Sequence, residues 1–482
     1  MNYSELLKLV LPEAILVAAA LATLALGLSK AGGRRFCPAI AAAGLIGAGL
    51  AILTLPAHAE LPHGMLVISP LTSLFKIICL ALALFTILTA SGRDDGPDVG
   101  EYIAMILFAT IGLLILAGAG ELLMIFVGLE LIGLSLYVLC AFDKTSARCA
   151  EAGLKYFLFG SMSGAFTLFG ISLIYGMTGV TGLQEIAQSV AAHGMPPLLA
   201  AGLMLLLAGL GFKIAAAPFH LWAPDVYEAA PASSVAFIAS GSKVAAFVIL
   251  GRILSVGFAS AQGSAAWHGL AAGWALPVAI LAAASIVVGN VAALAQKNVR
   301  RLLGYSAIAH AGYTLLGLLA GGAEGFAATL FYTTIYAFTL VGAFSVIGAL
   351  HRQGVGDSIA DLAGLRARSP LLAGCLAIFF LSLAGLPPLP GFFGKFYLFY
   401  ALLDRGGTPG MLWLVALALA GSLVSLYYYL MVLKSALVDE GTAAPAQLRW
   451  LDRAAIFCLG ALVLAFGLFP GFLLQRIVDS LR

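Results

Sequence analysis

Apolar stretches long enough to cross a lipid bilayer follow one another along the whole chain, and this feature limits the possible folds more than any other. About 20 consecutive apolar residues span the hydrocarbon core as an α-helix. Such stretches lie at 9–29, 37–55, 68–90, 100–118, 121–142, 154–178, 197–222, 231–257, 271–295, 300–320, 324–350, 370–403, 410–435 and 452–476. The longest connections between them are 179–196, 351–369 and 436–451, too short for a soluble domain. The sequence therefore predicts an all-α integral membrane protein with about 14 transmembrane helices.

The composition fits a chain that lipid surrounds. Hydrophobic residues make up 62% of the sequence and charged residues 10%, whereas soluble domains carry roughly 25% charged residues. The formal net charge is only +3, and the sequence has no basic patch with interleaved aromatic residues, so we expect no nucleic-acid partner. The 6 cysteines are scattered without the spacing of metal or iron–sulfur ligands. This pattern predicts that the chain itself binds no metal and no iron–sulfur cluster.

The placement of lysine and arginine predicts the orientation in the membrane, because cytoplasmic loops retain these residues. Arg34, Lys144, Arg300 and Arg366 fall in loops on one side, while the connections on the other side hold only Arg405. We therefore expect a multi-pass protein of the bacterial inner membrane with both termini extracytoplasmic. The first apolar run lacks the basic start and cleavage site of a signal peptide, so we expect it to remain as a helix.

A few charged residues lie inside the apolar segments. The basic ones are Lys76, Lys213, Lys243, Arg252 and Lys395. Arg252 lies near the end of its segment, so we expect its side chain to reach the interface. Lys76 lies early in its segment and either reaches the interface, which we favour, or has a functional role. Each of the other three has apolar sequence on both sides and costs at least ~2.5 kcal/mol at the bilayer centre. Glu130, in FVGLELIGLSLY, is the one carboxylate that we place well inside a segment.

Two interpretations of these interior charges are open. In the first, Glu130 and one lysine form a buried ion pair that only fixes helix packing. In the second, the charges form a proton relay. Burial disfavours the charged form of a lysine and a nearby carboxylate favours it, so a lysine between these effects gains or loses a proton as its partner moves. Because one carboxylate cannot neutralise three lysines, we favour the relay.

Prolines predict a break in two of the helices, each beside an interior lysine. The segment GLGFKIAAAPFHLWAPDVYEAAP contains three prolines, and its Lys213 precedes Pro218 by about one turn. The segment LSLAGLPPLPGFFGKFYLF contains three prolines ahead of Lys395. Proline removes a backbone donor and clashes with the preceding turn. Helices broken in this way line the ion sites of transporters built from inverted repeats.

The spacing of the charged residues suggests an internal duplication. Nearly the same shift along the chain carries Lys213 onto Lys395 and Glu130 onto His310. Segments 4–8 then overlay segments 9–13, which predicts two inverted five-helix repeats, each with a proline-broken helix. Lys243 has no basic counterpart. The predicted parts are an N-terminal three-helix segment (1–99), a first repeat (100–257), a second, inverted repeat (258–435) and a C-terminal helix (436–482).

Histidines and nearby charged residues complete the candidate site. His310 has a side chain suited to shuttle protons near neutral pH, or is satisfied structurally by a neighbouring helix. His220 follows the first break and either joins the relay or caps the broken end. Asp225 belongs to an entry vestibule or to an ordinary loop. Lys155 lies at a helix start and is either a solvated helix end or, with Glu151 four residues earlier, one of a helix pair that is accessory to the site.

Several segments of the sequence together resemble a known family. EYIAMILFATIGLLILAGAGELLMIFVGLELIGLSLYVL, EAGLKYFLFGSMSGAFTLFGISLIYGMTG, GFKIAAAPFHLWAPDVYEAAP, NVRRLLGYSAIAHAGY and GLPPLPGFFGKFYLF are similar to the antiporter-like membrane subunits of respiratory complex I, the NADH:quinone oxidoreductase. The resemblance covers essentially the whole chain. The opening LPEAILVAAALATLALGL and the lysine in GFFGKF resemble the N group of these subunits more than the M group. The absence of a long C-terminal lateral helix disfavours the L group.

The resemblance implies a function and a set of residues. It matches the family's helix-5 glutamate to Glu130, its two broken-helix lysines to Lys213 and Lys395, its helix-8 lysine to Lys243, and the histidine after the first break to His220. We expect protons to move through Glu130, Lys213, Lys243, His310 and Lys395, with no redox catalysis on this chain. The implied partners are the other membrane subunits of complex I. Flavin, iron–sulfur clusters and the quinone site belong to partner subunits, so NADH and quinone act only through the whole complex.

Three other classes of protein compete with this interpretation. A subunit of a multi-subunit cation/proton antiporter shares the fold and much of the motif set, and it is the main alternative. A solute carrier requires a polar binding pocket, whereas the mid-membrane groups here are nearly all titratable. A purely structural subunit does not require several costly interior charges.

Overall fold

The computed structural model describes residues 3–29, 33–90, 98–404, 409–441 and 448–481. Apart from the last two residues, the chain forms two compact units. Unit 1 comprises Met1–Lys213 and Gly241–Ser260, and unit 2 comprises Ile214–Ser240 and Ala261–Ser480. Arg405, on which the predicted orientation partly depends, lies outside the described residues.

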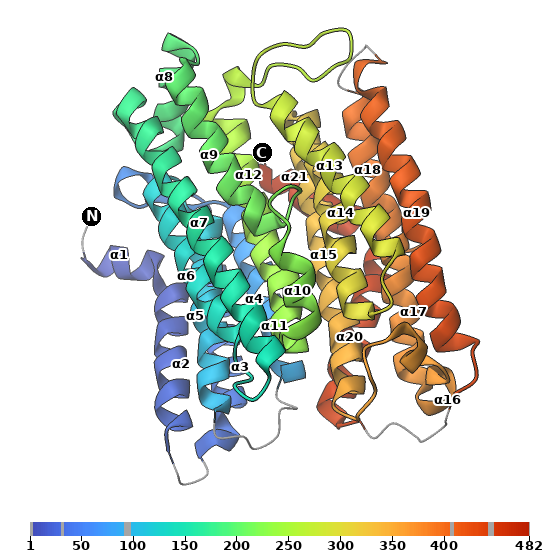
Figure 1. Cartoon of the computed structure of the whole chain (residues 1–482). Coiled ribbons are helices and arrows are strands. Elements are labelled where there is room, and N and C mark those ends of the chain that lie inside the picture. The colour runs from blue at the N-terminus through green and yellow to red at the C-terminus, as the bar shows by residue number, and fades with distance from the viewer. Residues whose placement is uncertain (1–2, 30–32, 91–97, 405–408, 442–447, 482) are drawn as a thin grey trace. The chain divides into compact units, whose positions relative to one another are not determined.

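The described part of unit 1 is built from helices (Figure 1) and from one short antiparallel hairpin. Its elements are α1 (Tyr3–Leu9), α2 (Leu11–Gly27), η1 (Gly33–Phe36), α3 (Cys37–Leu53), β1 (Ala59–Glu60), η2 (Pro62–Gly64), β2 (Val67–Ile68), α4 (Pro70–Ala90), α5 (Val99–Gly118), α6 (Leu122–Cys140), α7 (Ala147–Thr178), α8 (Leu183–His193), α9 (Pro197–Ile214, the last residue of which belongs to unit 2), α12 (Lys243–Arg252) and the π-helical turn η4 (Ile253–Gly257). Helix α5 packs against α2, α4, α6 and α12. Its approach to α2 requires glycine, because a Cβ on Gly27 would lie 2.7 Å from Cα of Gly100.

Unit 2 contains the remaining elements (Figure 1). They are α10 (Trp222–Ala229), α11 (Ala232–Phe237), α13 (Ala275–Leu294), α14 (Val299–Ala320), α15 (Gly322–His351), η6 (Ile359–Leu362), α16 (Leu365–Arg368), α17 (Pro370–Ala384), α18 (Pro390–Asp404), η7 (Pro409–Met411), α19 (Leu412–Leu437), α20 (Trp450–Leu468) and α21 (Pro470–Leu481), with the turns η3 (Ile238–Ser242) and η5 (Ala259–Ala261) at its boundaries with unit 1. Helix α14 packs against α10, α13, α15 and α18. Helix α15 also contacts α11, α17 and α20 and is buried over most of its length.

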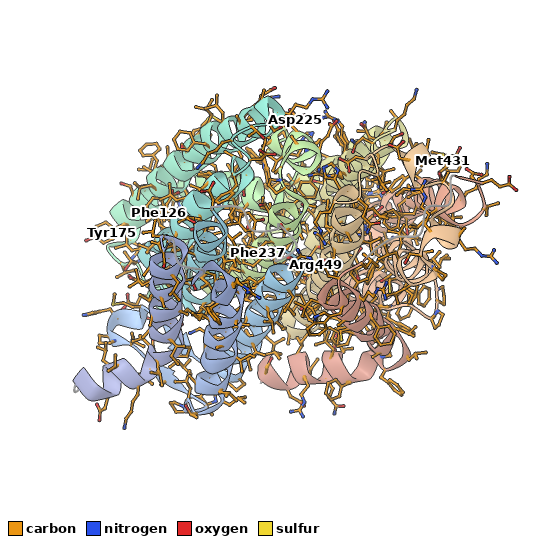
Figure 2. The ribbon with its side chains drawn as sticks, turned by 90° about the horizontal axis from the view of Figure 1, so that it is seen from below. Phe126, Tyr175, Asp225, Phe237, Met431 and Arg449 are labelled. Atoms are coloured by element: carbon orange, nitrogen blue, oxygen red, sulfur yellow. The ribbon has the colours of Figure 1, made fainter. Side chains whose placement is uncertain are left out.

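The predicted all-helical membrane architecture is confirmed. Among the described residues, 11 helices are long and apolar enough to span a bilayer. Three shorter apolar helices, Leu11–Gly27, Cys37–Leu53 and Pro370–Ala384, coincide with predicted segments, and the count of about 14 stays a prediction. Large apolar side chains face outward, as lipid contact requires. Leu158 and Phe169 on α7 are 57% and 58% exposed, and Tyr175 points outward from the same helix (Figure 2).

Three helices differ in detail from the sequence prediction. The first broken helix ends at Ile214, four residues before Pro218, and the next residue, Ala215, has a left-handed φ of 58°. The predicted segment 231–257 contains π-helical turns at Ile238–Ser242 and Ile253–Gly257. The predicted segment 452–476 is two helices, because α20 ends at Leu468 and α21 begins at Pro470. Proline is accepted at the start of a helix but not in its interior, which explains this last break.

Candidate functional site

In unit 1, the structure brings Lys213 to the face of α6 that carries Glu130. Lys213 lies in the last turn of α9 and is 7% exposed. Its Nζ lies 5.8 Å from the ring centroid of Tyr137, and a Cβ on Gly133 would come within 3.2 Å of it. Glu130, Gly133 and Tyr137 share one helix face because they are three and four residues apart. The carboxylate of half-buried Glu130 is close enough to act electrostatically on Lys213.

The Nζ of Lys213 has no hydrogen-bond partner among the described residues. An ammonium group has three donors, and a buried one without partners is costly unless water or a charge compensates it. Its place at the C-terminal end of α9 is favourable, because the helix dipole is negative there. The site therefore holds an ammonium group with a carboxylate nearby. None of the described residues accepts a hydrogen bond from its N–H groups.

Lys243 is the second of the predicted relay lysines in unit 1. It is 2% exposed and begins α12, directly after the π-helical turn Ile238–Ser242. Helix α12 packs against α4 and α5. Single π-helical turns inside helices are often found at functional sites, because they widen the helix and redirect its side chains.

In unit 2, Lys395 is held at the second helix break. It lies on α18, is 5% exposed, and donates to the carbonyl oxygen of Ala384 at 3.0 Å and to Oγ of Ser422 at 2.9 Å. Ala384 is the last residue of α17, so the ammonium lies at the negative end of that helix dipole. Its Nζ also lies 5.3 Å from the ring centroid of Tyr313. These three partners of the lysine are electrically neutral.

His310 lies in a network of tyrosines and one asparagine. Its Nδ1 is 2.6 Å from the Tyr332 hydroxyl, and its Nε2 is 3.0 Å from the Tyr429 hydroxyl. The Tyr429 hydroxyl also contacts that of Ser306. On the adjoining side of the network, Asn290 donates to the Tyr313 hydroxyl at 2.9 Å and accepts from Tyr428 at 3.2 Å. Tyr428 and Tyr429 are neighbours in sequence and Tyr313 faces Lys395, so polar groups extend from the histidine to the lysine.

These tyrosines and the asparagine were not predicted from the sequence as site residues. The available signal was the occurrence of hydroxyl-bearing aromatic and amide side chains inside strongly apolar segments, which need buried partners. Asn290 lies in α13, where the carbonyl oxygen of Ile286 accepts a further hydrogen bond from it at 2.8 Å. An asparagine inside a membrane segment is therefore a signal of the same kind as an interior lysine.

The residues around the first break contact α14 or α13 of unit 2. Asp225, labelled in Figure 2, lies on α10 rather than in a loop, and it binds Arg301 at 2.7 Å, as does Glu228 at 2.8 Å. The backbone N–H of Ala217 donates to Ser285 at 2.8 Å. His220 is half-buried, and its Nδ1 has no hydrogen-bond partner among the described residues.

Glu151 and Lys155 form the predicted pair within one helix. Their side chains are 2.8 Å apart on α7 and are 63% and 39% exposed. Exposed pairs of this kind contribute only a few tenths of a kcal/mol, roughly 0.3–0.5. The geometry is that of a solvated helix pair.

The prediction that Lys76 reaches the interface is wrong. Lys76 is 2% exposed and its Nζ is 2.6 Å from Oε1 of Glu13, a carboxylate on α2 that is itself 7% exposed. Glu130 is therefore not the only carboxylate placed inside a predicted segment. No local pattern predicts this pair, because the two residues are 63 positions apart in sequence. Arg252, by contrast, is half-buried and donates to the carbonyl oxygen of Ala117 at 3.4 Å.

The two helix breaks share landmarks that do not coincide with the lysines. The helices before the breaks end at Ile214 and Ala384, and the residues with positive φ that follow directly are Ala215 and Gly385. One shift along the chain therefore superimposes both landmarks. The shift that carries Lys213 onto Lys395 is longer, because Lys213 precedes its break whereas Lys395 follows its break. A single shift cannot superimpose both the breaks and the lysines.

In the described part of the chain, no group of three or more histidine, cysteine or acidic side chains is arranged to hold a metal ion. The chemistry that the site offers is proton transfer among amine, carboxylate, imidazole and phenol groups. These groups lie in two sets, one in each unit.

Comparison with known proteins identifies relatives over almost the whole chain. Residues 119–425 match the family described as NADH:quinone oxidoreductase/Mrp antiporter, transmembrane. NADH-quinone oxidoreductase subunit N 2 of Acidobacterium capsulatum is 46% identical, covering 98% of this chain and 99% of the relative. Subunit N of Desulforamulus reducens is 39% identical, covering 96% and 95%.

Solved structures give the same result. A chain of respiratory complex I from Thermus thermophilus with bound aureothin matches with a TM-score of 0.80 and 35% identity, covering 96% of this chain and 98% of that one. A chain of the Mrp complex from Dietzia matches with a TM-score of 0.84 but only 21% identity, covering 98% and 97%. This second likeness concerns the fold alone.

Proposed function

Because this chain belongs to the NADH:quinone oxidoreductase/Mrp antiporter family, we propose that it is the N-type, proton-translocating subunit in the membrane arm of an NADH:quinone oxidoreductase. Its partners are the other membrane subunits and the lipid bilayer. It is a subunit of an enzyme whose redox chemistry takes place on other chains. The flavin, the iron–sulfur clusters and the quinone site belong to those chains, and NADH and quinone act on this one only through the whole complex.

The observation that carries the proposal is the state of Lys213. A buried ammonium without a hydrogen-bond partner among the described residues, with a carboxylate acting on it, is poorly suited to a purely structural role. Structural ion pairs in proteins satisfy their remaining donors, because each unsatisfied one is costly. Proton affinity at such a lysine depends on how near the carboxylate lies, so a small displacement changes whether the proton stays.

The proposed cycle begins with a disturbance from a neighbouring subunit that alters the Glu130–Lys213 interaction. The proton that Lys213 releases passes by way of Lys243 to His310 and from there to Lys395, which releases it on the far side. Tyr332, Tyr429 and Tyr313 support the step in unit 2, since a hydroxyl group can accept one proton and donate another. The Asn290 amide orients the hydroxyls of Tyr313 and Tyr428. His220 and Asp225 serve the water-accessible side of the first break, and Glu151 and Lys155 are accessory.

The proposal includes an arrangement in the membrane. About 14 helices cross it, both termini are extracytoplasmic, and residues 100–257 and 258–435 form two inverted five-helix repeats. Residues 1–99 and 436–482 flank them. Arg34, Lys144, Arg366 and the end of α14 that holds Arg300 lie on the side of the bacterial cytoplasm.

A subunit of a cation/proton antiporter complex is the second candidate, because the Mrp chain shares the fold. The identity of 46% to a subunit N, against 21% to the Mrp chain, favours the first. Purification with peripheral redox subunits supports the oxidoreductase. Purification with membrane subunits alone supports the antiporter.

The test of the function is a charge-neutral double variant, Glu130→Gln with Lys213→Met, measured as proton translocation in membrane vesicles beside the amount of assembled complex. Lys213→Met alone leaves a half-buried carboxylate without its cation, so assembly also suffers. The double variant removes both charges and is expected to assemble but not to pump. Normal pumping by the assembled double variant would show that this pair does not carry the proton.

A further inference from the structure

Two consecutive arginines lie in the first turn of α14, where their charge is unfavourable for their own helix. Asn298 caps this helix, and its Oδ1 accepts from the backbone N–H groups of Arg300 at 2.9 Å and Arg301 at 3.0 Å. The N-terminal end of a helix carries a partial positive charge, so cations there are disfavoured by roughly 0.3–1 kcal/mol each. The reason for this placement must lie outside α14.

Both side chains bind α10, the short helix that follows the first break. The Nε of Arg300 donates to the carbonyl oxygen of Tyr227 at 3.1 Å, and its Nη2 donates to that of Ala230. These carbonyls form the C-terminal end of α10, which carries a partial negative charge. Arg300 is 5% exposed. A cation at the unfavourable end of its own helix is therefore at the favourable end of its neighbour.

Arg301 binds the side chains of the same helix. Its Nη1 lies 2.7 Å from Asp225 and 2.8 Å from Glu228, which are three residues apart and project from one face of α10. Arg300 thus holds the backbone of α10 and Arg301 holds its acidic side chains.

Asp357, in the connection between α15 and α17, completes the arrangement. Its Oδ2 lies 3.3 Å from Nη1 of Arg300, and its carbonyl oxygen accepts from the backbone N–H of Val299 at 2.8 Å. Burial raises the pKa of the Asp357 carboxyl, but the imidazole of His351, 3.5 Å from Oδ1, and the charge of Arg300 outweigh it and hold the pKa below its usual range. The carboxylate is therefore ionised at neutral pH and fixes the guanidinium of Arg300.

Helix α10 also lies directly against the backbone of α14. A Cβ on Gly304 would come within 3.1 Å of Cα of Pro224 and within 3.2 Å of Cβ of Tyr227. Even one methyl group at this position would force the two helices apart by a few tenths of an ångström.

We propose that Arg300 and Arg301 are positioning residues for proton transfer, which clamp α10 to α14 and so fix the geometry of the first helix break, residues 215–221. The proposal rests on the function proposed above. The break carries His220, and α14 carries His310 ten residues after Arg300, or about 15 Å along the helix. Neither arginine touches the transferred proton. Their effect is to hold the break and the His310 helix as one body.

The test combines two independent ways of loosening the clamp in the complete complex. The first is Arg300→Met with Arg301→Met, which removes the contacts. The second is Gly304→Ala, which keeps every charge but separates the helices. The matched controls are Arg352→Met, which breaks the ion pair with Asp452 at 2.8 Å, and Gly374→Ala, where an added Cβ meets nothing within 4 Å.

Two measurements on assembled complex decide the outcome: hydrogen exchange of residues 215–230, and protons translocated per NADH oxidised. Both clamp variants are expected to exchange about tenfold faster in this segment and to translocate at least about twofold fewer protons per NADH. Both controls are expected to leave the two values unchanged. Arg300→Lys, which retains the charge but not the forked contact with two carbonyls, is expected to give intermediate values.

Unchanged exchange in the clamp variants would overturn the clamp itself. Faster exchange with an unchanged proton ratio would overturn its role in proton transfer. Neither result depends on the Glu130→Gln, Lys213→Met variant. If that variant pumps normally, the proposed route fails, whatever the clamp variants show.

Discussion

The two broken helices place a buried lysine in different surroundings. In unit 1, Lys213 lies before its break with a carboxylate nearby, and its Nζ has no hydrogen-bond partner among the described residues. In unit 2, Lys395 lies after its break and donates to the carbonyl oxygen of Ala384 and to Ser422. The proton affinity of the first lysine therefore depends on a neighbouring charge, while the second lysine is held by fixed, neutral dipoles. We infer that the first is suited to respond to a disturbance and the second to receive a proton in a constant place.

The largest expected effect is that of Lys395→Met. Because the partners of Lys395 are neutral, its removal leaves no unpaired buried charge, and assembly is expected to persist. Proton translocation per NADH is expected to fall about tenfold or more, since Lys395 is the one lysine in the described segment around this break. The same change at Lys213 should lower both assembly and translocation. Equal loss of assembly in the two variants would contradict the comparison.

A residue with positive φ follows the helix end at each break, alanine at the first and glycine at the second. Exchanging the two residue types between these positions gives a reciprocal pair of variants. Gly385 has φ 85°, and a Cβ there would come within 3.1 Å of Cδ of Lys395. Gly385→Ala is therefore expected to destabilise unit 2 and to lower translocation several-fold. Ala215→Gly should instead stabilise the protein by about 1 kcal/mol, because a left-handed alanine is strained by roughly that amount. Thermal unfolding of the purified complex measures both changes, and destabilisation by Ala215→Gly would contradict this account.

A smaller effect is expected from removing one partner of Lys395. Ser422→Ala deletes a hydrogen bond to a charged group, which typically contributes about 1.5–3 kcal/mol. Translocation is expected to fall a few-fold, with assembly retained. Ser435→Ala is the matched control on the same helix, since that hydroxyl binds the carbonyl oxygen of Ile359 at 2.7 Å and no route residue. A full loss of translocation in Ser422→Ala would mean that the hydroxyl itself carries the proton.

The smallest effect on pumping is expected at Lys76, a buried lysine outside both breaks. Lys76 is paired with Glu13 at 2.6 Å. Lys76→Met alone leaves Glu13 buried without its cation and should destabilise the protein by roughly 3–5 kcal/mol. The double change with Glu13→Gln should restore assembly and leave the protons per NADH unchanged. Loss of pumping in the restored double variant would extend the route to this pair.

The sequence was sufficient to predict the helical membrane class, the helix breaks and the buried state of Lys213, Lys243 and Lys395. These predictions depend on local properties, namely apolar length, proline and charge. The pairing of Lys76 with Glu13 and the tyrosines around His310 depend on contacts between residues far apart in sequence. The spacing of apolar residues along a helix carries no information about such contacts. The shift along the chain that relates the two breaks could not be predicted either, because the lysines suggested a longer shift than the one that relates the helix ends.

One consequence concerns how the second break can change during evolution. One of the two acceptors of Lys395 is the carbonyl oxygen of Ala384, which belongs to the main chain. No codon change at that position can delete this oxygen, so a mutational scan that reads side-chain replacements does not detect its contribution. Selection can act on it only through the residues that decide where α17 ends, chiefly Gly385 and the prolines that follow. The part of the lysine's surroundings that tolerates substitution best is therefore also the part that sequence variation records least.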